Sequence, residues 1–267
     1  MPRPDGALGR RVPKTYGGRR KLIYVTGDIH GDDSITKLGA KRFPEGRSLT
    51  KDDLVIILGD FGLFWDPAMP RRDTYWLDWL DSKPWTTAFI DGNHENHEML
   101  KAMPYEIRFG GLVGVHPKWS SVVYLRRGQT YILPDGVTAF CMGGASSHDI
   151  KWRTEGKSWW SDELPSEEDF AVARKSLDAC DWHVDYVFTH DCPSSVKQRL
   201  LSTWNDADDV SERIENDRLN DFLDEIDGRL RYGRWFFGHY HVDEEIDDRH
   251  VAMYHDILAI SQTDESV

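Results

Sequence analysis

Five short segments of the sequence contain residue types that bind metal ions. They span residues 27–30, 59–60, 92–95, 189–191 and 238–241 and read GDIH, GD, GNHE, THD and GHYH. Each follows an apolar, β-branched or aromatic run, which is typical of a buried strand. In an open α/β sheet, ligand sites form in the loops at the carboxyl ends of the strands. We therefore expect the five segments to converge on one site.

The donor types in these segments indicate a transition-metal site. The seven candidate ligands are Asp28, His30, Asp60, Asn93, His190, His239 and His241. Carboxylate and amide oxygens mixed with imidazoles suit Mn²⁺, Fe or Zn²⁺ rather than Ca²⁺ or a thiolate-bound metal. Seven donors are too many for one ion, and a carboxylate can bridge two ions about 3.5–4 Å apart. We expect two divalent metal ions, with Mn²⁺ favoured over Fe or Zn²⁺ and Asp60 as the bridge.

The order of these segments resembles the calcineurin-like metallophosphoesterases. The pattern of that family is D-x-H, G-D, G-N-H-[DE], a lone His and G-H-x-H, and every part is present between residues 27 and 241. The resemblance implies that one ion is held by Asp28, His30, Asp60 and His241. It implies that the other is held by Asp60, Asn93, His190 and His239. His94 would then lie beside the substrate, where it protonates the leaving oxygen or stabilises the phosphoryl charge.

These residue types suit the hydrolysis of phosphate esters. Such esters are anionic and repel hydroxide, so catalysis needs positive charge at the phosphoryl oxygens and a nucleophile available near neutral pH. Two divalent ions provide both. A bridging hydroxide would attack phosphorus in line, and His94 would assist departure of the alkoxide as the catalytic acid.

The resemblance also implies a fold, an α-β-β-α sandwich of two mixed β-sheets flanked by helices. Periodicity alone indicates only an α/β protein. Residues 73–80 and 166–177 read as amphipathic helices, and a third helical stripe runs over residues 210–226. Short strands at residues 122–125 and between residues 130 and 141 indicate a second, more antiparallel sheet.

We expect a single domain at residues 21–260, after a basic arm at 1–20 and before a polar tail at 261–267. The formal charge of −13 disfavours unaided binding of nucleic acid but leaves a nucleotide substrate open. Three cysteines without metal-type spacing fit reduced thiols in the cytoplasm. No apolar segment that would indicate a membrane partner follows the basic arm, and no protein partner is evident.

The substrate is predicted less directly than the metal site. Protein phosphatases of this superfamily carry an arginine just before Gly-Asn-His, where this chain has Asp91. Arginine forks suit phosphomonoester dianions, so their absence favours a phosphodiesterase acting on a small diester such as a cyclic nucleotide or dinucleotide. The alternatives are a phosphomonoesterase or nuclease of the same superfamily. A non-catalytic metal-binding scaffold is disfavoured because no ligand is missing.

The segment 143–149 and the residues after it are the best candidates for substrate contacts. This segment follows a strand, is rich in glycine, and resembles a feature of prokaryotic and phage-borne members of the superfamily. Arg153 is the first candidate phosphate contact and His148 the second. Tryptophans nearby could stack on a base or pack against the second sheet. His97 is a third candidate, either as a substrate contact or as a group that supports a site residue from behind. The alternative is a helix-start residue facing solvent.

Overall fold

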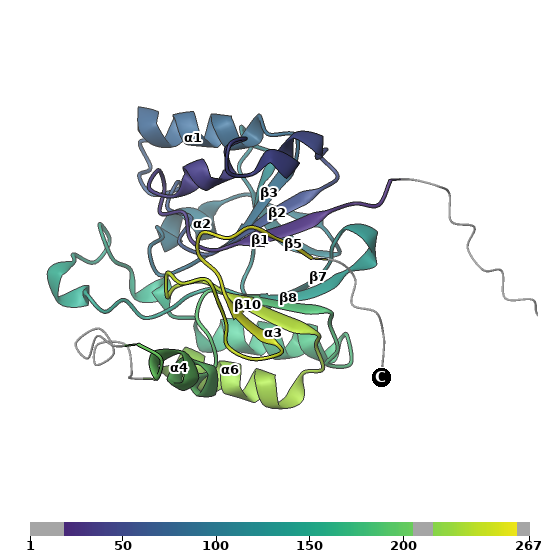
Figure 1. The fold of residues 1–267 in the computed structure, drawn as a ribbon. Helices are drawn as coiled ribbons and strands as arrows, with labels where there is room; N and C mark the ends of the chain where they lie inside the picture. The colour runs from purple at the N-terminus through teal and green to yellow at the C-terminus, as the bar shows by residue number, and fades with distance from the viewer. Residues whose placement is uncertain (1–18, 205–215, 261–267) are drawn as a thin grey trace, which may run out of the picture.

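The computed structural model of the chain describes residues 19–204 and 216–260, in which two β-sheets lie face to face (Figure 1). The seven-stranded sheet, in spatial order, consists of β13 (Leu258–Ile260), β1 (Ile23–Thr26), β2 (Leu54–Leu58), β3 (Thr86–Ile90), β6 (Val122–Leu125), β5 (Gly111–Val115) and β4 (Tyr105–Arg108). The six-stranded sheet consists of β11 (Glu244–Glu245), β12 (His250–Ala252), β10 (Arg234–Phe237), β9 (Tyr186–Thr189), β8 (Thr138–Met142) and β7 (Gln129–Ile132).

Helices cover the outer faces of both sheets. Over the seven-stranded sheet lie α1 (Arg71–Asp81) and α2 (His97–Ala102), and over the six-stranded sheet lie α3 (Glu167–Asp178), α4 (Ser194–Leu201) and α6 (Arg218–Arg229). Short 3-10 turns are formed by Ile35–Leu38, Pro44–Ser48, Pro134–Gly136, Ile150–Trp152 and Ser161–Glu163. Among the described helices, none combines the length and apolar character needed to cross a membrane.

Helix starts follow local sequence signals. Ser166 caps α3 by accepting from the Asp169 N–H, and the Asp169 carboxylate accepts in return, which completes a capping box. Asp217 and Asn220 do the same for α6. The helices predicted at residues 73–80 and 166–177 are confirmed. The third predicted stripe is confirmed from Arg218 onward, and its earlier part at residues 210–215 lies outside the described residues.

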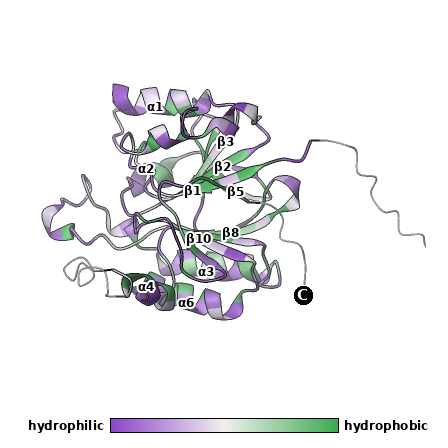
Figure 2. Ribbon diagram, viewed as in Figure 1, coloured by the Kyte–Doolittle hydropathy of each residue, from purple (hydrophilic) through white to green (hydrophobic). Residues whose placement is uncertain are grey.

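Alternation along the strands divides the apolar residues between an inner layer and two outer ones. Along β2, Leu54, Ile56 and Leu58 face the space between the sheets, whereas Val55 and Ile57 pack on the side of α1. Strands β8 and β10 alternate in the same way between the inner layer and the helices beneath. Figure 2 shows mainly green strands between helices that carry both purple and green. The predicted α-β-β-α sandwich is confirmed.

One expectation about the sheets is wrong. The strand pattern at residues 122–125 predicts a place in the second sheet, but β6 pairs in parallel with β3 of the first. Of the three predicted strands, only β7 and β8 lie in the second sheet, where they form one antiparallel pair and β11 and β12 form another. The chain passes between the sheets at Gly128, which has a φ of 71° and donates its N–H to the Cys141 carbonyl oxygen. The sequence pattern of residues 122–125 does not reveal this crossing. A strand that is buried on both faces has the same apolar pattern whichever sheet it joins.

The five metal-type segments follow the carboxyl ends of parallel strands, as predicted. Strands β1, β2 and β3 run parallel in the first sheet, and β9 and β10 run parallel in the second. The loops after all five strands therefore lie at corresponding edges of the two sheets. The basic arm predicted at residues 1–20 is described only at Arg19 and Arg20, and the tail at 261–267 lies outside the described residues.

Candidate metal centre

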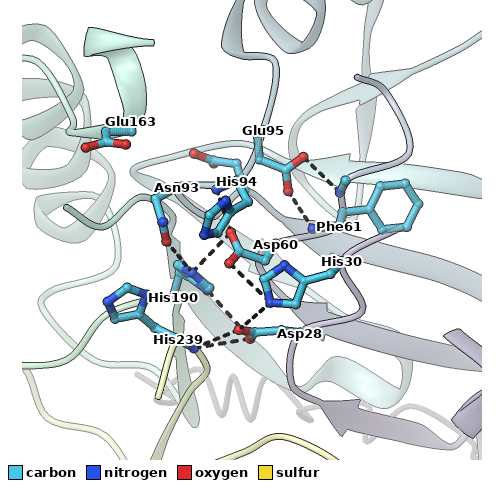
Figure 3. A network of polar contacts seen from close by, with 12 residues as sticks. Asp28, His30, Asp60, Phe61, Asn93, His94, Glu95, Glu163, His190 and His239 are labelled. Atoms are coloured by element: carbon cyan, nitrogen blue, oxygen red, sulfur yellow. Dashed lines mark hydrogen bonds and ion pairs between the residues drawn. The ribbon is translucent and has the colours of Figure 1, made fainter. Parts of the chain in front are cut away.

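Side chains from the five segments meet in one place (Figure 3). Asp28, His30 and His241 each bring a donor atom within 4.8 Å of the others. Asp28, Asp60 and His190 do the same. The two groups share Asp28 and are neighbours, so the donor set fits two adjacent divalent ions.

Asp60 belongs to the second group and also faces His30 of the first. Its Oδ2 is 3.6 Å from His30 Nε2, and its Oδ1 is 3.3 Å from His190 Nε2. The backbone N–H of His94 donates to the same Oδ1 at 2.7 Å. The two oxygens of a single buried carboxylate thus face the two groups, as those of a bridging ligand would.

The His190 ring is oriented from its far side. Its Nδ1 donates to the Leu58 carbonyl oxygen at 2.7 Å, so Nε2 faces Asp60 and lies 3.1 Å from Asn93 Oδ1. Burial opposes a charge on this ring, but the carboxylates of Asp60 and Asp28 raise its pKa to about 10. Positive charge is therefore favoured at the point where Nε2 meets these oxygens, which fits a cation-binding site.

His239 and His148 lie on the flank of the site. The backbone N–H of His239 donates to both carboxylate oxygens of Asp28, at 3.1 and 3.2 Å. The His239 ring centroid is 5.1 Å from that of His190 and 5.5 Å from that of His148. Within the described residues, neither donor group includes His239. The ring of His148, a predicted substrate contact, lies beside that of His239.

Four of the candidate ligands have left-handed backbone conformations. The φ values are 46° at His30, 43° at Asp60, 69° at His239 and 54° at His241. Residues other than glycine rarely adopt such values, which cost about 1–3 kcal/mol each. Strain of this kind persists only where the surroundings fix it, and it gathers at functional sites.

Glycines allow the loops to come this close. A Cβ on Gly92 would lie 2.1 Å from Asp60 Oδ1, and one on Gly238 would lie 2.3 Å from Asp28 Oδ1. Both contacts are far inside van der Waals distance. Glycine at the start of the GNHE and GHYH segments is therefore required by the approach of a neighbouring carboxylate.

His94 and Arg153 form a pair beside the donor groups. Arg153 Nη2 lies 2.9 Å from His94 Nδ1, while its Nε and Nη1 donate to Asp149 Oδ1 and to the Ser158 carbonyl oxygen. A guanidinium only donates, so Nδ1 accepts and a neutral His94 ring carries its proton on Nε2. Burial, together with the charges of Arg153 and His30, lowers the pKa of His94 despite the nearby Asp60 carboxylate.

His97 is not brought together with the other candidates. It is the first residue of α2, is 3% exposed, and has its Nδ1 3.9 Å from Asp91 Oδ2. It lines a small cavity with Tyr124 and Arg127, apart from the cavity beside His94. Burial and the charge of Arg127 lower its pKa to about 3. The solvent-facing alternative is wrong, since the ring is buried.

Glu95 was not singled out by the sequence, although it belongs to a motif. It is fully buried, and its carboxylate accepts from the backbone N–H groups of Phe61 and Gly62 at 2.6 and 3.1 Å (Figure 3). These are the residues immediately after Asp60. Glu95 therefore fixes the turn that presents Asp60, and its adjacency to the motif was the available signal.

Lys37 holds the first ligand loop and was not predicted. Its buried Nζ donates to the carbonyl oxygens of Gly27 and Asp28, both at 2.9 Å, and to that of Tyr254. Tyr254 in turn stacks on the His241 ring at a centroid distance of 4.6 Å. Burial lowers the pKa of Lys37 to about 8. A single lysine between Thr36 and Leu38 carries no signal of such a role.

Two mixed sheets with aspartate and histidine donors at their joint edge define a metal-dependent hydrolase. The family model for calcineurin-like phosphoesterases matches residues 21–243, and the chain belongs to this family. It is therefore a metal-dependent phosphoric ester hydrolase. Among solved structures, it is similar to the calcineurin-like phosphoesterase YfkN from Bacillus subtilis, with 13% identity, a TM-score of 0.37, and coverage of 92% of this chain and 86% of that one. A comparison with curated proteins gives no match.

Proposed function

We propose that the protein is a two-metal phosphodiesterase that hydrolyses a small diester such as a cyclic nucleotide or a dinucleotide. The observation that carries the proposal is the meeting of two donor groups that share Asp28, with Asp60 facing His30 of one group and His190 of the other, directly beside His94 and Arg153. Two divalent ions, with Mn²⁺ favoured, would neutralise the anionic ester there and lower the pKa of a water towards neutrality. The ligands assigned to them are Asp28, His30, Asp60 and His241, and Asp60, Asn93, His190 and His239.

His94 is assigned to the leaving oxygen. Since Arg153 donates to Nδ1, the proton of the His94 ring is available on Nε2. The ring also lies next to His30, at a centroid distance of 5.3 Å. An Nε2–H group in this place can donate to the ester oxygen on which charge develops as the bond to phosphorus breaks.

The charges around the cleft support a diester. The guanidinium of Arg153 is paired with Asp149 at 2.6 Å, and that of Arg72 with Asp73 at 2.7 Å. A paired guanidinium offers less net charge to a ligand. A diester carries a single negative charge and needs less compensation than a monoester dianion, which arginine forks serve best.

A cavity beside His94 has room for one substituent of such a diester. Its volume is about 240 Å³, and its walls are His30, Gly62, Trp65, Arg72 and His94. The indole of Trp65 packs edge-on against Trp160, at 5.3 Å between centroids. An aromatic wall of this kind can stack on a base. Arg153 and His148 are proposed as the further substrate contacts, whereas His97 would act only through Asp91.

The proposal is tested by comparing bis-p-nitrophenyl phosphate with p-nitrophenyl phosphate. The protein is stripped with chelator and resupplied with Mn²⁺, Zn²⁺ or Mg²⁺. A metal-dependent preference for the diester is expected. A preference for the monoester would indicate a small-molecule phosphatase instead, and inactivity with both ions bound would indicate a non-catalytic scaffold.

We further propose that residues 21–260 act as one domain in the cytoplasm. His241 Nε2 lies 3.2 Å from Asp28 Oδ2, so the site joins the first strand to the last quarter of the chain. All three cysteines are free thiols, which suits a reducing compartment.

A further inference from the structure

A chain of hydrogen bonds leads from the metal centre to a buried carboxylate. Asn93 Nδ2 donates to Ser147 Oγ at 3.0 Å, and Ser147 Oγ donates to Glu163 Oε2 at 2.6 Å. The backbone N–H of Ser147 donates to the other oxygen of Glu163 at 2.9 Å. The three residues are 4%, 6% and 2% exposed, so water does not compete for these bonds. Glu163 lies on the Asn93 side of the site in Figure 3.

The direction of this chain is fixed by its members. A side-chain amide nitrogen only donates, so Ser147 Oγ must accept from Asn93. The serine has one proton, and that proton goes to Glu163. Asn93 Oδ1 is left on the opposite side of the amide, 3.1 Å from His190 Nε2. An amide has nearly the same shape in its two orientations, and only its surroundings distinguish them.

We propose that Ser147, held by Glu163, is a positioning residue that turns the oxygen of Asn93 towards the ion beside His190. This inference rests on the ligand assignment in the proposed function. Without the serine hydroxyl, the Asn93 amide can rotate and present its NH₂ group, which cannot bind a cation. Groups that orient a metal ligand from behind are worth about 10- to 100-fold in metal affinity.

Glu163 is itself held firmly. Its carbonyl oxygen accepts from Arg127 Nη2 at 2.9 Å, and Arg127 Nε donates to Asp91 Oδ2 at 2.6 Å. Gly144 N–H donates to the Asp91 carbonyl oxygen at 3.0 Å. Both ends of the 144–163 loop are therefore fastened to Asp91, two residues before Asn93. A Cβ on Gly144 would lie 2.4 Å from the Glu163 carbonyl oxygen, so only glycine lets these ends meet.

Two neighbouring serines provide a matched comparison. Ser147 forms a hydrogen bond with Asn93, whereas Ser146 forms one with Asp217. We would titrate chelator-treated protein with Mn²⁺ by calorimetry, using wild type, Ser147→Ala and Ser146→Ala. Ser147→Ala should weaken one of the two binding events by about 10- to 100-fold and leave the other unchanged. Ser146→Ala should match wild type.

A second pair of variants separates orientation from packing. In Asn93→Asp the carboxylate presents an oxygen whichever way it turns, so adding Ser147→Ala should cause no further loss of Mn²⁺ affinity. A loss that persists in the Asn93→Asp background would overturn the proposal, as would a wild-type isotherm for Ser147→Ala.

Folding of the variants is followed by thermal melts of the metal-free proteins. If Ser147→Ala does not melt cooperatively, Ser147→Thr and Ser147→Val are compared in its place. Threonine and valine have similar volumes, and only threonine has a hydroxyl group. Threonine should then bind Mn²⁺ more tightly than valine, and equal binding would refute the role. A wild-type protein that binds no Mn²⁺ or Zn²⁺ would instead refute the ligand assignment, and this inference with it.

Discussion

The two sheets bring different chemistry to the same site. Loops of the seven-stranded sheet supply all the oxygen donors, which are Asp28, Asp60 and Asn93, together with His30. Loops of the six-stranded sheet supply only imidazoles, which are His190, His239 and His241. In the proposed assignment, the first set would carry the negative charge that attracts the ions, and the second would complete their coordination without adding charge. The comparison indicates a division between the two sheets. The seven-stranded sheet would supply the charge that attracts the ions, and the six-stranded sheet would supply neutral ligands that complete their coordination.

The largest effect is expected at Asp60, the carboxylate that faces both groups. Asp60→Asn removes the charge and one oxygen, so both ions should be lost, and with them all metal-dependent turnover. Metal content per protein after gel filtration measures this directly. Asp33→Asn, an exposed neighbour in the His30 loop, is the control and should keep both ions. Retention of two ions by Asp60→Asn would remove the bridging assignment.

A smaller loss is expected on the imidazole side. His190→Gln removes a neutral ligand of one ion and keeps every carboxylate, so one ion should be lost and the other retained. The same metal analysis applies, with the exposed His183→Gln as the reference. If His190→Gln lost both ions, the two sheets would not differ in the way described.

His94 tests the chemistry apart from metal binding. His94→Ala leaves all seven proposed ligands in place, so metal content should equal that of wild type, while turnover falls by about 10²- to 10⁴-fold. The loss should be greatest for esters of poorly leaving alcohols, which need the most assistance. Full activity of His94→Ala on an alkyl ester would show that the leaving oxygen departs without it.

Arg153 extends the comparison, because it comes from a loop of the second sheet and touches His94 of the first. Arg153→Ala removes a charge-assisted hydrogen bond worth about 1.5–3 kcal/mol, which corresponds to about 10- to 150-fold in kcat/KM. Steady-state kinetics on a diester would measure it, with the exposed Lys151→Ala as the control. Equal kinetics for the two variants would exclude Arg153 from substrate binding.

The smallest effect is expected on the stability of the fold. It concerns His97, which is not one of the proposed ligands. The pKa of His97 is about 3 in the folded protein, below its usual value of 6.5. Between these values the unfolded chain binds a proton that the folded protein excludes, so stability falls as the pH drops, by about 1.4 kcal/mol per pH unit. His97→Leu should remove this slope from urea-unfolding free energies measured between pH 6 and pH 4. An unchanged slope would mean that other groups cause it.

The ligand positions could be predicted because each depends on local sequence. An apolar run followed within a few residues by Asp, Asn or His indicates both the strand and the place of the side chain at its end. The five segments all follow the carboxyl ends of strands, where the pattern puts them. The segment after β8 was predicted for the same reason, and it does bring Arg153 to His94.

Residues that hold the ligands from behind could not be predicted in this way. Ser147 reaches Asn93 across 54 positions of the sequence, and Arg127 reaches Asp91 across 36. Neither spacing corresponds to a helix or strand period, and serine and arginine are common on surfaces. The assignment of β6 failed for a related reason, since alternation specifies a face but not a partner strand.

The left-handed turns at His30, Asp60, His239 and His241 have a consequence for sequence drift. Glycine would relieve backbone strain at each of these positions and remove a ligand in the same step. A lineage released from selection for hydrolysis would thus gain stability by losing its ligands, since functional strain and stability oppose each other. In such relatives, glycine at these positions would record the loss of catalysis while the two sheets remain intact.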